Sequence, residues 1–255
     1  MTDFDFKSFA NLLADEAGTI SRHYFGQSLD IISKEDASPV TIADRTIELR
    51  LRELVERERP EDGILGEEFG PKESKSGYTW VFDPIDGTKS FTIGRPTFGN
   101  LIGLCDGETP ILGIINHPIL NQRWVGQTGQ QTTYNGMPVS CRPCPTLKDA
   151  IFGTGSATQI NDNDPARLSR IEAVTRYTVF QGDCHFYGLM ANGMMDAIVE
   201  DHLGIYDFVA LVPVIEGAGG VITDWQGNPK TLHGNSTLIA TGGKNIHEEL
   251  MIVIK

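Results

Sequence analysis

The sequence predicts a protein of mixed α and β structure, with an α+β first half and an α/β second half. Apolar residues recur at helical spacing in the first 60 residues, and turn residues then separate strand-like runs up to about residue 140. After about residue 145, short apolar runs alternate with helical runs, which is typical of an α/β arrangement. Because 255 residues can hold one large domain or two small ones, we expect the halves 1–145 and 146–255 to pack as one unit.

Two helices are predicted at the start of the chain. The first follows apolar residues at three- and four-residue steps between Phe6 and Tyr24, with Gly26 near its end. The second begins at a capping pattern formed by Thr41 and Asp44. Its apolar face and its end are marked by Ile47, Leu51, Leu54, Val55 and Pro60.

Strands are predicted for the rest of the first half. We expect the second of them, "YTWVFD", to stop at Asp83, because Pro84 stiffens the chain that follows. The strongest hairpin turns are Asp106-Gly107 and Asn135-Gly136. The strand-like stretches, each bounded by turn residues, are 63–70, 78–83, 100–118 and 122–139.

The second half alternates strands and helices. The pattern predicts one continuous helix over 206–220, which has to tolerate Pro213. The other predicted helices cover 165–177, 186–194 and 245–254. The predicted strands fall within 150–156, 178–184, 196–200, 221–227 and 237–242.

Composition limits the partners that this chain can have. Its formal net charge of −13 repels nucleic acid and anionic lipid, and it repels phosphate unless metal ions intervene. No apolar run is long enough to span a bilayer, and the acidic N-terminus does not look like a signal peptide, so we expect a cytoplasmic protein. Its four cysteines are expected to be reduced, and Cys141 and Cys144 lie in a proline-containing loop that suggests no function.

The segment "WVFDPIDGTKSF" at 80–91 holds the main chemical signal. Asp83 and Asp86 follow a strand, Gly87 permits a sharp turn, and Thr88 lies near a helix start, where backbone N–H groups bind anions. Carboxylate oxygens suit Mg²⁺ or Ca²⁺. The alternative interpretation is an ordinary turn in which both aspartates act as caps.

Further acidic residues at the ends of elements favour the metal interpretation. Glu67 and Glu68 end a strand, and Asp44 and Asp207 each start a helix, although each alone is typical of a cap or a solvated surface. The segment lacks the alternating ligands of an EF-hand. Its aspartates are three residues apart, which excludes the D-x-D-x-T pattern of haloacid-dehalogenase-type phosphatases.

Four segments together resemble the inositol monophosphatase superfamily. They are "SPVTIAD" (38–44), "GEE" (66–68), "DPIDGT" (83–88) and "YDFVALVPVIEGAGG" (206–220), and their order and spacing agree over essentially the whole chain. Within the superfamily, Lys89-Ser90-Phe91 and Gly94-Arg95-Pro96 resemble the histidinol-phosphate phosphatase branch.

The resemblance implies a layered α-β-α-β-α sandwich of the inositol monophosphatase and fructose-1,6-bisphosphatase type, a homodimer, and Mg²⁺-dependent hydrolysis of a small phosphorylated metabolite. Two to three Mg²⁺ ions per subunit are implied, with most of the metal ligands in the first half of the chain. The implied metal ligands are Glu67, Asp83, the Ile85 carbonyl, Asp86 and Asp207.

The resemblance also implies catalytic and substrate-binding residues. Glu67 and Thr88, the latter held by Asp44, are implied to activate the attacking water. The implied substrate contacts, some of them in the second half, are Asp86, Gly87, Thr88, Gly182, Asp183, Cys184 and Glu200. Asp183 and Glu200 complement the amine and imidazole of histidinol phosphate, although Asp183 could instead cap the helix that follows it.

Histidinol-phosphate phosphatase is therefore the first functional hypothesis. An inositol-1-monophosphatase or a broad sugar-phosphate phosphatase is the alternative within the same fold. Bisphosphatases are less expected because no additional basic cluster is evident for a second phosphate. A non-catalytic, metal-binding regulatory dimer is the alternative from a different class, and the complete ligand set with Thr88 disfavours it.

Overall fold

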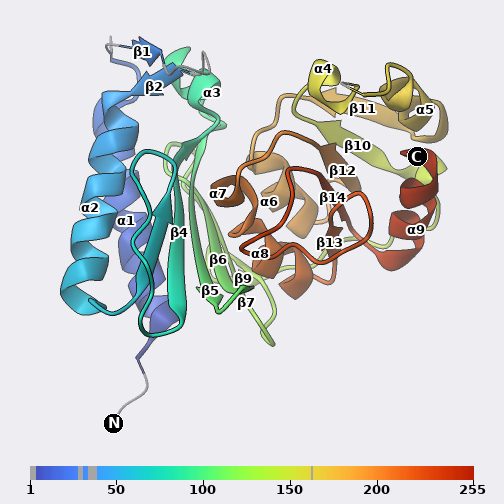
Figure 1. The fold of residues 1–255 in the computed structure, drawn as a ribbon. Coiled ribbons are helices and arrows are strands. Elements are labelled where there is room, and N and C mark those ends of the chain that lie inside the picture. The colour runs from blue at the N-terminus through green and yellow to red at the C-terminus, as the bar shows by residue number, and fades with distance from the viewer. Residues whose placement is uncertain (1–3, 28–30, 34–38, 162) are drawn as a thin grey trace.

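The computed structural model describes residues 4–27, 31–33, 39–161 and 163–255. Its elements stack as helices, sheet, helices, sheet and helices, as Figure 1 shows from the N-terminal to the C-terminal side. This arrangement confirms the layered α-β-α-β-α sandwich. The described chain begins at the first helical layer and ends beside the last, so it crosses the whole stack.

The first layer consists of α1 (Phe6–Tyr24) and α2 (Ile42–Glu58), and both predicted helices are confirmed. The Asp5 carboxylate caps α1 by accepting the Ser8 N–H at 3.0 Å. The predicted apolar face of α2 is buried: Ile47, Leu51, Leu54 and Val55.

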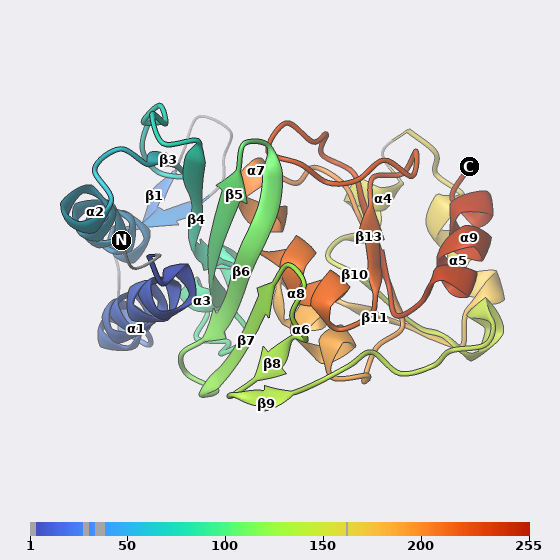
Figure 2. The same cartoon turned by 90° about the horizontal axis from the view of Figure 1, so that it is seen from below.

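The large sheet lies next to this layer, and Figure 2 shows it between α1 and α2 on one side and α6 and α8 on the other. Only its β3–β4 pair is parallel. At the second predicted hairpin turn, Asn135 and Gly136 have φ values of 47° and 82°, as a tight turn requires. In sheet order the strands are β3 (Gly63–Gly66), β4 (Tyr78–Asp86), β5 (Gly99–Asp106), β6 (Thr109–His117), β7 (Gln122–Gln127), β8 (Thr133–Tyr134) and β9 (Met137–Pro138).

The central strand β4 runs further than predicted. Asp83 pairs with Leu101 of β5, and pairing resumes at Asp86 opposite Gly99 after a shift of register. Two residues of β4 therefore lie opposite one residue of β5, which is a β-bulge. The predicted end at Asp83 was wrong because Pro84, which has no N–H for the ladder, disturbs the pairing without ending it.

The middle layer contains α6 (His185–Ala191), α7 (Ile205–Phe208) and α8 (Leu211–Gly217). The prediction of one helix over 206–220 was wrong, because the chain breaks between α7 and α8. Pro213 has no N–H to donate to the carbonyl four residues earlier, at Val209, and its ring collides with that carbonyl. The break therefore falls at Val209 and Ala210.

Three glycines of the large sheet let this broken segment approach closely. A Cβ on Gly113 would lie 1.9 Å from the Ala210 oxygen, and one on Gly126 would lie 2.2 Å from the Pro213 oxygen. On the neighbouring strand, a Cβ on Gly103 would lie 2.6 Å from a Val209 methyl carbon. The backbone around the break thus rests directly on β5, β6 and β7, and this contact fixes the position of α7.

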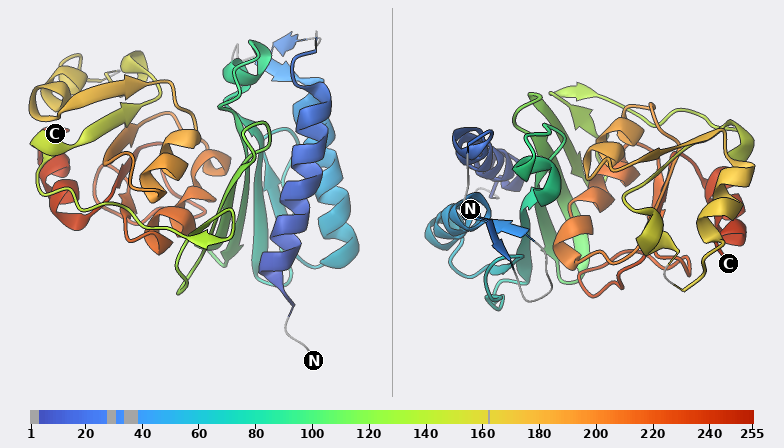
Figure 3. Two further views of the ribbon diagram at one scale, coloured as in Figure 1. Left: turned by 180° about the vertical axis from the view of Figure 1, so that it is seen from behind. Right: turned by 90° about the horizontal axis from the view of Figure 1, so that it is seen from above.

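The second sheet carries the α/β part of the chain, and Figure 3 shows it between the middle helices and the C-terminal helices. The predicted division after residue 145 falls in the crossing from β9 to β10. In sheet order its strands are β11 (Tyr177–Phe180), β10 (Ile151–Thr154), β12 (Ala197–Glu200), β14 (Leu238–Thr241) and β13 (Val221–Thr223). The outer helices are α4 (Ala157–Ile160), α5 (Arg167–Val174) and α9 (Lys244–Val253).

Several short elements were not predicted. They are β1 (Ile31–Ser33), β2 (Pro39–Thr41), α3 (Thr88–Thr92), a 3₁₀ turn at Leu147–Asp149, and α4, although a helix start near Thr88 was expected. The Thr41 side chain of the predicted capping pattern and Ser38 of the "SPVTIAD" segment lie outside what the structure describes. None of the helices in the described part of the chain combines the length and apolar character that a membrane crossing needs.

Candidate active site

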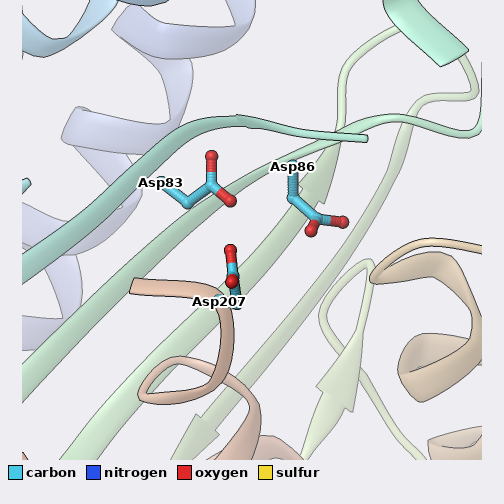
Figure 4. Close-up of side chains that lie close together, drawn as sticks. All are labelled: Asp83, Asp86 and Asp207. Atoms are coloured by element: carbon cyan, nitrogen blue, oxygen red, sulfur yellow. The ribbon is translucent and has the colours of Figure 1, made fainter. Parts of the chain in front are cut away.

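Three carboxylates from two distant parts of the chain converge between the large sheet and the middle helices. Asp83 and Asp86 come from β4, Asp207 comes from α7, and one oxygen of each lies within 4.8 Å of the others. Figure 4 shows the three side chains pointing toward one another. Asp83 is buried, whereas Asp86 and Asp207 are partly accessible. The sequence analysis predicted all three as metal ligands, and the structure brings them together.

The β-bulge explains how two aspartates of one strand reach the same place. In a regular strand, side chains three residues apart point to opposite faces of the sheet. The extra residue between Asp83 and Asp86 removes this mismatch, so both can face Asp207. The proline in "DPID" thus helps to create the site by preventing regular pairing.

Backbone N–H groups hold the two partly accessible carboxylates, Asp86 and Asp207. Asp207 Oδ2 accepts the N–H of Gly204 at 2.6 Å, which caps the start of α7. Asp86 Oδ2 accepts the N–H of Cys184 at 2.6 Å. The cap predicted as the plain alternative for Asp207 is therefore present together with the cluster, and one carboxylate takes part in both.

The electrostatics of the cluster favour a bound cation. Burial raises the pKa of Asp83 well above its ordinary value, and the charges of Glu67, Asp86 and Asp207 raise it further. Burial likewise raises the pKa of Asp86, with Asp183 and Asp207 adding to the effect. Asp83 Oδ1 is buried and has no hydrogen-bond partner among the described residues. A divalent cation would satisfy this oxygen and offset the repulsion, so the donor set fits a hard metal ion.

Glu67 extends the acidic cluster from the end of β3. It lies close enough to Asp83 for its charge to raise the pKa of that carboxyl. Its loop is held by Glu48, which accepts the N–H of Glu68 at 2.7 Å and pairs with Arg52 at 2.8 Å. The sequence analysis missed Glu48, although an acidic residue beside Ile47 on the apolar face of α2 was a usable signal.

Gly87 and Thr88 form the turn beside the aspartates. Gly87 has a φ of 82°, a left-handed conformation that favours glycine, and it precedes the short helix α3. Thr88 Oγ1 donates to the carbonyl of Ile85 at 3.2 Å. Asp44 is buried in the first turn of α2. That Asp44 holds Thr88 stays a prediction.

A pocket of about 630 Å³ opens from the carboxylates toward the second sheet. Asp86 and Asp207 lie on its wall, together with Asp183, Cys184 and Glu200. Gly182 is buried against the ring of Phe186 and is not part of the wall, so its contact with substrate stays a prediction.

Asp183 faces this pocket from a strained position. Its φ of 48° is unusual for a residue with a side chain, and its Oδ2 accepts the Ser90 hydroxyl at 2.6 Å. The helix that follows, α6, has no side-chain cap. The alternative that Asp183 is a helix cap is therefore wrong. Burial raises the pKa of Asp183, while Ser90, Arg95 and Lys89 oppose the rise.

Glu200 stands at the end of β12 on another wall of the pocket. The hydroxyl of Tyr187 donates to its Oε2 at 2.6 Å. Burial raises the pKa of Glu200 to about 7. Tyr187, Lys89 and Arg95 also line this pocket. Lys89 and Arg95 were noted only as parts of the branch motifs, and Tyr187 was not predicted, because nothing in its sequence context marks it.

Comparisons with known proteins agree with this geometry. Residues 5–254 match the model of the inositol monophosphatase family. The chain is 42% identical to the bifunctional phosphatase IMPL2, chloroplastic, of Arabidopsis thaliana, over 98% of this chain and 75% of that protein. It is 34% identical to a histidinol-phosphatase of Mycobacterium tuberculosis, over 94% of each chain.

Solved structures show the same similarity. An inositol monophosphatase from Zymomonas mobilis has a TM-score of 0.88 and is 42% identical, covering 97% of this chain and 96% of its own. Relatives named for histidinol phosphate and for inositol phosphate thus both align along nearly the full chain.

Proposed function

The chain belongs to the inositol monophosphatase family and is a metal-dependent phosphatase, and we propose that its substrate is histidinol phosphate, an intermediate of histidine biosynthesis. The observation that carries the proposal is the placement of Asp183 and Glu200 on the pocket beside the metal-binding carboxylates. Two carboxylates there complement a leaving group that carries an amine and an imidazole.

We propose Mg²⁺ as the metal, with two to three ions per subunit held by Glu67, Asp83, the Ile85 carbonyl, Asp86 and Asp207. Oxygen ligands of this kind suit Mg²⁺. When bound, the metal supplies a more acidic water, neutralises the phosphate dianion and stabilises the leaving oxygen. At 4 Å, a carboxylate would otherwise repel each phosphate charge by about 4 kcal/mol at an effective dielectric of 20.

The residues of the chain itself orient the reactants. In the proposal, the Glu67 carboxylate accepts a hydrogen bond from the attacking water, and the Thr88 hydroxyl helps to hold that water in line with the phosphorus. Asp44 holds Thr88 in place. The N–H groups of Gly87 and Thr88 bind a phosphate oxygen. Attack by water requires no covalent intermediate on the protein.

The leaving group occupies the pocket toward the second sheet. Asp183 accepts a hydrogen bond from Ser90 at 2.6 Å, so its orientation is fixed before substrate binds. Glu200 is oriented in the same way by Tyr187. Ordered carboxylates bind a cation without first losing side-chain freedom. In this proposal they recognise the histidinol amine and imidazole, and Cys184 completes that wall. Gly182 lies behind the wall, and its contact with substrate is part of the proposal.

Replacing Asp183 with Asn tests the role of its charge. We expect KM for histidinol phosphate to rise by about tenfold, corresponding to about 1.4 kcal/mol of lost binding. KM for a neutral sugar phosphate should change little, because that leaving group has no cation. Steady-state kinetics on both substrates provide the measurement. An equal rise for both substrates would contradict charge recognition.

The inositol phosphate alternative is supported by the 42% identity to the inositol monophosphatase of Zymomonas mobilis. A substrate panel separates the two functions: histidinol phosphate, inositol 1-phosphate, fructose 1,6-bisphosphate and a nucleotide bisphosphate. We expect kcat/KM to be highest for histidinol phosphate. A tenfold preference for inositol 1-phosphate would make the alternative the better account.

We also propose a homodimer in the cytoplasm. The dimer is supported by β11, an edge strand of the second sheet that exposes Tyr177, Val179 and Phe180. The cytoplasmic location is supported by the four cysteines, none of which forms a disulfide, as suits a reducing compartment.

A further inference from the structure

A row of hydrogen bonds leads from the surface of α1 into the buried interior, where it reaches the bulge that carries Asp83 and Asp86. From it we infer that Asn100, on β5, is a positioning residue for the metal site. Its carboxamide holds the carbonyl of Pro84 and so keeps the two aspartates on one side of the strand. The inference rests on the proposed function, because it concerns the same metal-binding carboxylates.

The contact with the bulge is direct. Asn100 Nδ2 donates to the Pro84 carbonyl oxygen at 2.6 Å and to Ser21 Oγ at 2.9 Å. Asn100 is fully buried, so bulk water does not reach this donor. It is also the single β5 residue that lies opposite the two bulged residues of β4. One side chain therefore donates to a backbone carbonyl at the point where the regular pairing of β4 and β5 is interrupted.

Asn100 is in turn oriented by residues behind it. Its Oδ1 accepts from Asn116 Nδ2 at 2.9 Å. The Oδ1 of Asn116 accepts from Arg123 Nε at 2.9 Å. Arg123 is anchored by Asp15, which accepts from its Nη2 at 2.7 Å. The row thus runs from Asp15 on α1 through Arg123, Asn116 and Asn100 to the bulge.

The two ends of the row fix the direction of every hydrogen bond in it. A guanidinium can only donate, so Asn116 has to turn its oxygen to Arg123 and its NH₂ to Asn100. Asn100 then has to turn its oxygen to Asn116 and its NH₂ to Pro84, whose carbonyl can only accept. Each carboxamide has one orientation that satisfies both neighbours. Arg123 therefore specifies that a donor, and not an acceptor, faces the metal-binding loop.

This arrangement matters for the metal because the bulge brings Asp83 and Asp86 within reach of one ion. If the Pro84 carbonyl lost its donor, a buried acceptor would be unsatisfied, and the loop would relax toward another pairing. Asp83 and Asp86 would then spend less time in the conformation in which both face one metal ion. Partners behind metal ligands commonly change metal affinity by about 10–100-fold.

The experiment measures Mn²⁺ binding directly, by titration calorimetry of metal-stripped full-length protein. Asn100→Leu keeps the branching at Cγ and removes the donor, and we expect it to weaken Mn²⁺ binding by about tenfold. Its phosphatase activity should recover when Mg²⁺ is raised by a similar factor. Thr132→Val is the matched control, since it removes a buried hydroxyl that donates to the Val214 carbonyl at 2.7 Å, away from the metal loop.

A second variant tests the direction of the row. Asn116→Asp keeps the shape and gains an ion pair with Arg123, but its carboxylate now accepts the NH₂ of Asn100. Asn100 should then turn its oxygen toward Pro84, so we expect a folded protein with Mn²⁺ binding weakened by about tenfold. This variant also decides the matter if Asn100→Leu does not fold.

The outcomes are distinguishable. The inference would be overturned if Asn116→Asp bound Mn²⁺ with wild-type affinity. It would also be overturned if Thr132→Val lost as much Mn²⁺ affinity as Asn100→Leu, because the row would then only stabilise the fold. If wild-type protein itself bound no Mn²⁺, the proposed metal site would fail first, and the inference would fail with it.

Discussion

Glu200 shows how one residue can be costly to the fold and useful to the site. Its carboxyl lies at the end of β12, receives the hydroxyl of Tyr187, and has a pKa raised by burial to about 7. A charged carboxylate there is disfavoured until something positive arrives. We propose that the cationic leaving group of the substrate is that partner. The charged Glu200 then lowers the stability of the free protein and strengthens substrate binding.

The pH dependence of Glu200→Gln tests this cost. The folded pKa of about 7 lies above the ordinary 4.5, so the Glu200 contribution to stability is complete below pH 4.5 and lost as pH rises toward 7. The variant has no such group and does not lose this stability. Between pH 4.5 and 7 its free energy of unfolding should therefore rise relative to that of the wild type. Urea denaturation of both metal-free proteins measures the difference.

Titrating groups that do not interact with Glu200 cancel in that comparison. His117, whose pKa burial lowers to about 3, is present in both proteins and contributes equally. A difference between variant and wild type that stayed constant from pH 4.5 to 8 would contradict the raised pKa of Glu200.

Residue-scale prediction from sequence succeeded where the residue type itself carries the chemistry. Asp83, Asp86 and Asp207 could be found because carboxylates at the ends of elements are conspicuous. Asn100 and Glu48 could not, because an amide in an apolar strand and an acid in a helix acquire their roles only from partners far along the chain.

At the scale of elements, the break between α7 and α8 places the Asp207 ligand. The helical hydrogen bonding is interrupted at Val209 and Ala210, and the backbone there rests directly on the large sheet. Apolar periodicity could not show the break, since apolar residues continue through it. Pro213 was the available signal, and the prediction underestimated its effect on the carbonyl four residues earlier.

Replacing Gly113 with Ala tests this docking. Its Cβ would lie 1.9 Å from the Ala210 oxygen, so backbone has to move, and we expect about 1–3 kcal/mol of destabilisation. Phosphatase activity should fall as well, because α7 shifts with Asp207. Thermal and urea unfolding provide the stability measurement.

Gly70→Ala is the control for that substitution. A Cβ on Gly70 would have nothing within 4 Å, so its stability should stay within about 0.5 kcal/mol of the wild type. Equal effects of the two substitutions would show that the close approach at Gly113 is unimportant.

At the scale of the whole molecule, the site exists only because the layers stack. Asp83 and Asp86 come from the large sheet and Asp207 from the middle helices, while Glu200 comes from the second sheet. Periodicity predicted most elements individually but not their stacking, since strand order and layer contacts depend on residues far apart in sequence. The five-layer arrangement followed from the family resemblance of the motifs.

Diffraction from crystals grown with Mn²⁺, recorded with its anomalous signal, tests the central claim most directly. Mn²⁺ accepts the same oxygen ligands as Mg²⁺ and can be located without ambiguity. We predict an anomalous peak enclosed by the carboxylates of Asp83, Asp86 and Asp207. A map at saturating Mn²⁺ with no peak among these three residues would contradict the account.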